Sequence, residues 1–65
     1  MINLDIYLED KLLEQFIKLT SNPFKDNDLI TIHNTLYKVI DIEKSIFRKG
    51  FEPTQIKIDV FVELV

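Results

Sequence analysis

Hydrophobic and polar residues alternate in three separate stretches of this chain. Near the start, apolar residues occupy every second position from Ile2 to Leu8, a period of two that predicts a strand with one solvated face. A similar alternation fills residues 55–65, where we expect the longest strand of the fold. Both stretches therefore predict half-buried strands of a sheet.

The third alternating stretch, residues 28–42, predicts an antiparallel hairpin. We place a two-residue turn at Asn34 and Thr35, because Asn tolerates the positive φ of a type I′ turn, although a β-branched Thr adopts it poorly. This turn would pair Ile32 with Tyr37. One face of the ribbon then holds Ile30, Ile32, Tyr37 and Val39, and the other holds Leu29, Thr31, His33, Leu36, Lys38 and Ile40.

Residues 10–19 have a different spacing, which predicts an amphipathic helix. Asp10 is placed to cap the start of this helix, and Lys18 suits the negative end of its dipole. Pro23 prevents the helix from continuing, so we expect a loop with Phe24 folded back against the core. The apolar face covers about 160° of the helical wheel and consists of Leu12, Leu13, Phe16, Ile17 and Leu19.

These elements predict an α+β domain of the order β-α-β-β-β that spans residues 1–65. One helix would cover one face of a small, mostly antiparallel four-stranded sheet, and residues 43–54 would form a loop before the last strand. We expect the first strand to pair with the fourth, because terminal strands often lie side by side. A small, partly closed β-barrel with one helix is the alternative architecture.

Composition limits how such a small domain is stabilised. The chain has 65 residues, of which 46% are hydrophobic, and no cysteine, so neither a disulfide nor a cysteine-bearing zinc site can compensate for a small core. Idealised packing and self-association are the usual remedies, and we favour self-association into a homo-oligomer, most simply a homodimer. The lack of cysteine also fits a reducing compartment, which favours a cytoplasmic location.

Charge and hydropathy argue against two classes of partner. The formal net charge is −3, which does not favour general attraction to nucleic acid or to an anionic membrane. The first residues lack the basic region of a signal peptide, and no apolar run approaches the roughly 18 residues of a membrane span. We therefore expect no membrane partner.

The chain lacks the residues of common active sites, so we expect no enzymatic activity. It has one histidine, His33, no cysteine, and serines only at Ser21 and Ser45, which does not supply a nucleophile with a base and an orienting group. Residues 26–28 lack the spacing of a calcium loop, and Gly50 alone cannot form a phosphate-binding loop. We expect no cofactor and no metal.

Two binding hypotheses remain. The first is a protein-interaction module, because more apolar residues lie on the strands than one helix can cover. Its partner-binding residues would be Leu29, Leu36, Ile40, Ile42, Phe61 and Val65. The alternative is a nucleic-acid-binding accessory domain, since basic residues interleaved with aromatic ones can contact phosphates and stack on bases. Its contact residues would be Lys44, Phe47, Arg48, Lys49 and Phe51.

The segment Asp28-Leu-Ile-Thr-Ile-His-Asn-Thr-Leu-Tyr-Lys-Val39 resembles the central hairpin of many small β-rich domains. These include short proteins encoded by phages and other mobile elements. The resemblance covers about a fifth of the chain. The resemblance assigns no functional residues. The small size of the chain and its lack of catalytic residues favour, by analogy with such proteins, an inhibitor or accessory protein that acts by binding a partner.

Overall fold

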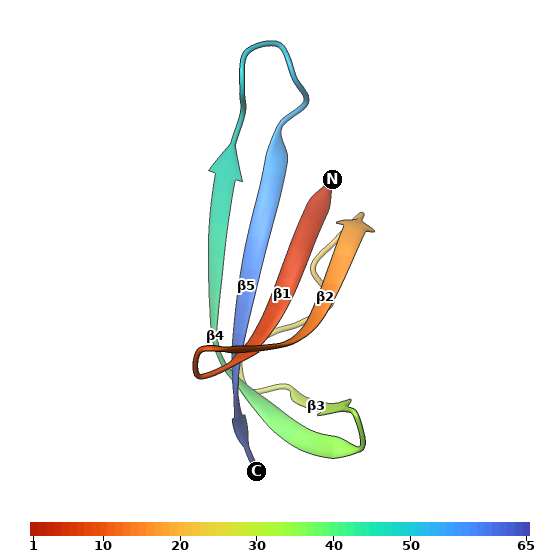
Figure 1. Cartoon of the computed structure of the whole chain (residues 1–65), viewed down its shortest axis with the longest axis vertical. Coiled ribbons are helices and arrows are strands. Elements are labelled where there is room, and N and C mark those ends of the chain that lie inside the picture. Colours follow the sequence, from red (N-terminus) through yellow and green to blue (C-terminus); the bar gives the residue numbers. More distant parts are fainter.

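The chain forms a single five-stranded sheet without any helix (Figure 1). The computed structural model describes residues 1–65. The strands are β1 (Ile2–Leu8), β2 (Lys11–Leu19), β3 (Leu29–Ile32), β4 (Thr35–Phe47) and β5 (Gln55–Leu64). Their order in the sheet is β2-β1-β5-β4-β3, and only the β1–β5 pair is parallel. The expected α+β class, its four-stranded sheet and the helix in both predicted architectures are therefore wrong.

The sheet curls into a half-barrel around its own apolar side chains. We call the face that these side chains occupy the core face, and the opposite one the second face. Phe24 comes from the connection between β2 and β3, which lie at opposite edges of the sheet, and it packs against the core as expected. The eight buried apolar residues are Leu4, Ile6, Ile32, Tyr37, Val39, Ile58, Val60 and Val62.

Residues 11–19 form strand β2 because two irregularities bring apolar residues spaced by three to one face. Phe16 pairs with Leu4 and Leu19 pairs with Ile2, so three residues of β2 span the same distance as two of β1. Lys18 takes up the extra residue with a φ of 58°. A second irregularity lies opposite residues 6 and 7, and Leu13 there packs against the core. The same spacing that fits a helix therefore also fits a bulged strand.

The central hairpin is confirmed, with a different turn from the one predicted. The turn residues are His33 and Asn34, with φ values of 50° and 65°, and Ile32 pairs with Thr35. Asn and His adopt positive φ more readily than Thr, which explains why the turn lies one residue earlier. Moving the turn by one residue moves the pairing by two, so the predicted faces are unchanged. Ile30 accordingly pairs with Tyr37 on the core face.

Strand β4 differs from the prediction in its length and in the direction of one side chain. This strand has 13 residues and extends to Phe47, so it is longer than the 10-residue β5 and fills part of the predicted loop 43–54. An irregularity between Val39 and Asp41 reverses the alternation after it and turns Ile42 toward the core. The predicted pairing of the first strand with the last is confirmed, in parallel, from Ile2–Ile56 to Leu8–Val62.

Candidate interaction surfaces

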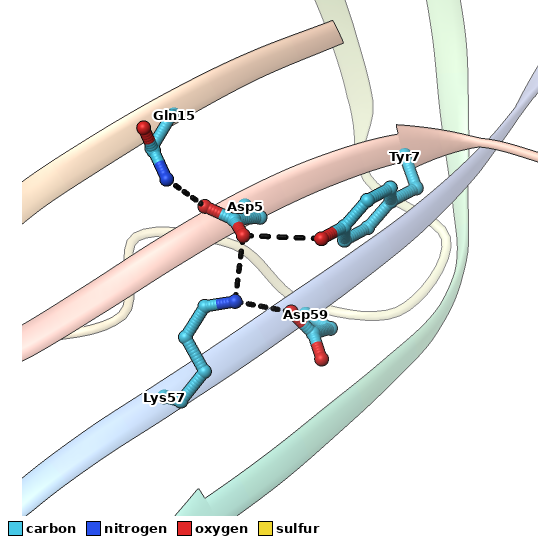
Figure 2. A network of polar contacts seen from close by, with 5 residues as sticks. All are labelled: Asp5, Tyr7, Gln15, Lys57 and Asp59. Carbon is cyan, nitrogen blue, oxygen red and sulfur yellow. Dashed lines mark hydrogen bonds and ion pairs between the residues drawn. The ribbon is translucent and has the colours of Figure 1, made fainter. Parts of the chain in front are cut away.

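A polar network joins three strands on the second face of the sheet (Figure 2). Asp5 lies at its centre and is only 5% exposed. Its Oδ2 accepts hydrogen bonds from Lys57 Nζ at 2.6 Å and from the Tyr7 hydroxyl at 3.1 Å, and its Oδ1 accepts one from Gln15 Nε2 at 2.9 Å. Lys57 Nζ also donates to Asp59 Oδ1 at 2.9 Å. The network therefore connects β2, β1 and β5 at one level of the sheet.

The network favours the ordinary charge states of Asp5, Lys57 and Tyr7 at neutral pH. Burial alone raises the pKa of Asp5, but hydrogen bonds from Lys57, Gln15 and Tyr7 outweigh burial and hold that pKa below its usual value of 3.8. The hydrogen bonds to Asp5 and Asp59 raise the pKa of Lys57, and the bond to Asp5 raises the pKa of Tyr7. None of the three shifts brings a group toward titration near pH 7, so the network is suited to joining strands rather than to proton transfer.

The network is a feature that the sequence prediction missed. The signal for it was present, because Asp5 and Tyr7 lie on the predicted wet side of the first strand and Lys57 and Asp59 on that of the last. The parallel register pairs Asp5 with Asp59 directly and thereby brings both wet sides together. Knowing the pairing without its register was not enough to place the lysine between the two carboxylates.

The six predicted partner-binding residues divide into two groups in the structure. Ile42 packs against the core, and the Phe61 ring stacks on Tyr7 with centroids 5.7 Å apart, so both side chains are partly covered within the chain. The other four are exposed: Leu29, Leu36, Ile40 and Val65. None of these four residues belongs to the core or to the residues that pack against it.

These four exposed residues lie toward one end of the sheet. Thr31 pairs with Leu36 and Leu29 with Lys38, so Leu29 and Leu36 share the second face of the β3–β4 hairpin. The register continued one residue beyond the Tyr37–Leu64 pair places Val65 across from Leu36. Ile40 lies in the irregularity of β4 close by. We call these four residues, Leu29, Leu36, Ile40 and Val65, the hairpin patch.

His33 and Glu14 link the two edges of the curled sheet. His33 Nε2 lies 3.3 Å from Glu14 Oε2, so the turn of the β3–β4 hairpin approaches strand β2 across the open side of the half-barrel. The backbone N–H of Gln15 together with His33 lowers the pKa of Glu14. Both side chains are substantially exposed, so this contact contributes little to the free energy of unfolding. We assign it a role in bringing the two edges of the curled sheet together.

The basic and aromatic residues proposed for nucleic-acid contact do not form one surface. Alternation along β4 places Lys44, which pairs with Ile58, on the core face, whereas Phe47, which pairs with Gln55, lies on the second face. Arg48, Lys49 and Phe51 belong to the connection between β4 and β5. All five side chains are exposed, and Phe51 is completely so.

The β4–β5 hairpin extends beyond the other strands at one end of the molecule (Figure 1). Strand β1 begins opposite Ile56, whereas β4 and β5 are still paired one position further, at Phe47 and Gln55. We call this projecting end of the β4–β5 hairpin the arm, and residues 46–51 the arm tip. Gly50, with a φ of 59°, helps to form its turn, together with a hydrogen bond from Glu52 N–H to Lys49 C=O.

Neither a metal centre nor a membrane-spanning helix is found in this structure. No three His, Asp or Glu side chains are grouped so that they could hold a metal ion. None of the elements is a helix with the length and apolar character needed to cross a membrane. Comparison with known protein families, with curated proteins and with solved structures finds no match to the chain.

Proposed function

We propose that this chain is a non-catalytic protein-interaction module that binds through the hairpin patch. The observation that carries the proposal is the exposure of large apolar side chains on a sheet that no other element covers. Leu29 is 62% exposed and Leu36 is 44% exposed, although both belong to regular strands. Contiguous apolar surface of this kind is typical of a protein-binding site.

A second copy of the chain is the partner that we propose first. A stable interface buries about 800 Å² on each partner, which is roughly a sixth of the 4954 Å² surface of this chain. The patch lies beside the short edge strand β3, so a two-fold contact would also cover part of an exposed sheet edge. A small core without disulfides makes such association useful for stability as well.

The proposed role is that of an inhibitor or accessory protein of the kind that phages and mobile elements encode, acting by covering a surface on its partner. The polar network supports the non-catalytic part of this proposal, since its pKa shifts hold Asp5 charged and Lys57 protonated at neutral pH. The cysteine-free composition supports a cytoplasmic location.

Light scattering coupled to size exclusion tests the self-association directly. We expect the wild-type chain to be dimeric at high micromolar concentration and Leu29→Lys to be monomeric, because the variant places a charge in the apolar contact. Ile17→Lys is the matched control, since Ile17 is also 62% exposed but lies on β2, away from the patch. A wild-type chain that is monomeric at every concentration would contradict the proposed dimer.

A further inference from the structure

The β4–β5 arm separates positive charge from the rest of the molecule. Residues 44–51 contain three of the eight Lys and Arg residues and none of the eleven Asp and Glu residues, and with the flanking Glu43 and Glu52 the segment keeps three cations against two anions, a net charge of +1. The residues outside 44–51, with five cations against eleven anions, therefore carry a formal charge of −6. Lys44, Arg48 and Lys49 form no ion pair within the chain. The net charge of the whole chain hides this local excess.

Apolar side chains surround the end of the same arm. Ile46 pairs with Ile56 on the core face, Phe47 lies on the second face, and Phe51 projects from the connection between the strands. These side chains are 63%, 54% and completely exposed, respectively. The arm tip is thus apolar on both faces and at its end, with Arg48 and Lys49 between the aromatic rings.

The net charge of the chain led us to expect no membrane partner, but from the local charge and exposed apolar residues of the arm we propose that the arm tip binds an anionic lipid bilayer by inserting its apolar side chains among the lipid headgroups. A tip that is apolar all around is suited to immersion, where every side is covered at once. The three cations next to it would meet the negative headgroups, as polybasic segments do at the cytoplasmic leaflet. This site is separate from the hairpin patch and does not depend on the proposed dimer.

The shape of the molecule allows this contact despite its acidic body. The longest dimension is 43 Å, with the arm at one end and the β3–β4 hairpin toward the other (Figure 1). Because charges are screened over about 8 Å at physiological ionic strength, acidic residues at the far end would not oppose the approach of the tip. The tip would therefore point at the bilayer and the hairpin patch away from it.

Single-stranded nucleic acid fits the same arm less well. A strand lying along the arm needs cations and aromatic rings on one face, whereas Lys44 and Phe47 lie on opposite faces. The second face, which carries Phe47, also carries the carboxylates of Glu43 and Asp59, directly paired across β4 and β5. A strand of phosphates lying along that face would meet like charge, whereas a bilayer would contact the arm tip, which lies beyond the Glu43–Asp59 pair along β4.

Co-sedimentation with vesicles tests the proposal with the intact chain. We expect binding to phosphatidylcholine vesicles that contain phosphatidylserine, and at least tenfold weaker binding to phosphatidylcholine alone. Arg48→Gln with Lys49→Gln should weaken binding by about five-fold per cation removed, and Phe51→Ser should weaken it by about tenfold. The controls are Leu12→Ser and Lys25→Gln, which remove an exposed apolar side chain and an exposed cation elsewhere and should leave binding unchanged.

Three outcomes would overturn the inference. The first is no binding to anionic vesicles by a chain whose circular dichroism shows the folded sheet. The second is binding that survives Phe51→Ser, which would leave only nonspecific charge attraction. The third is tighter binding to single-stranded DNA with the same dependence on Arg48, Lys49 and Phe51, which would assign the arm to nucleic acid.

Discussion

Replacing Lys57 by Met is predicted to be among the most destabilising single changes outside the apolar core. Lys57 donates hydrogen bonds to Asp5 and Asp59 and supplies the only positive charge in the network. Met has a similar length and packs comparably along the strand, so the variant mainly removes the charge and its hydrogen bonds. The buried carboxylate of Asp5 would then keep only Gln15 and Tyr7 as donors.

The size of the effect follows from the burial of the two partners. Removing one member of a fully buried ion pair costs about 3–5 kcal/mol. The Asp5 side chain is 7% exposed, but that of Lys57 is 28% exposed, so water can partly replace the ammonium group. We therefore expect a loss of about 2–3 kcal/mol in the free energy of unfolding. Since a chain of this length has about 3–10 kcal/mol in total, the midpoint of thermal unfolding should fall by about 10–20 °C.

Urea unfolding followed by far-ultraviolet circular dichroism measures this loss. Asp59→Asn is the control, because Asp59 is partly exposed and its change should cost less than about 1 kcal/mol. The Asp5→Asn/Lys57→Met double variant should be more stable than Lys57→Met by at least about 1 kcal/mol, since it also removes the buried charge. The reasoning is refuted if Lys57→Met lies within about 0.5 kcal/mol of the wild type, or if the double variant recovers nothing.

Three further predictions use the same assays. Asp5 has a lowered pKa in the folded state, so its stabilisation is present above its unfolded value of about 3.8 and lost as the pH falls through the folded pKa. Asp5→Asn should accordingly flatten the acid limb of the stability profile, and an unchanged limb would argue against the network. Changing His33 to Asn and Asn34 to Gly should stabilise the chain by about 0.5–1 kcal/mol, because Asn-Gly favours the positive φ values of this turn; a loss of stability would indicate a different turn. Asp41→Ala should increase aggregation in light scattering, because Asp41 Oδ1 accepts the Ile42 N–H in the part of β4 that lies beyond its pairing with β3; Glu43→Ala is the control, and equal aggregation of both variants would contradict a role of Asp41 in protecting this strand from pairing with another chain.

Local alternation predicted strands where the alternation is regular. The first and last strands and the central hairpin were found because their apolar residues follow a period of two. The faces of the hairpin survived an error in its turn, since moving the turn from Asn34–Thr35 to His33–Asn34 shifts the pairing by two residues. Face assignment in such a hairpin is thus more robust than register.

The helix was mispredicted because bulges imitate helical spacing. Leu13, Phe16 and Leu19 are three residues apart, which fits one side of a helix. In the structure, one extra residue in β2 at each of two irregularities gives the same spacing on one face of a strand. Pairing with β1 decides between the two, and a pairing between strands is not visible in the local spacing of one segment.

The candidate surfaces depended on long-range placement in the same way. The irregularity after Val39 turned Ile42 from the predicted binding face to the core, and the stacking of Phe61 on Tyr7 required the β1–β5 register. Leu29 and Leu36 lie exposed on the second face that the alternation assigned to them. Leu29 and Leu36 could therefore be placed from the sequence, whereas Ile42 and Phe61 required knowledge of the bulge and of the register between strands.

The central claim, that the hairpin patch is a protein-binding surface, is tested most directly by nuclear magnetic resonance on a dilution series. The account predicts that the backbone amide shifts of Leu29, Leu36, Ile40 and Val65 change together between about 10 μM and about 1 mM protein and fit one dissociation constant. The amides of Asp5 and Lys57 should not change over the same range. Concentration-independent shifts at the hairpin patch, or changes centred on another surface, would contradict the claim.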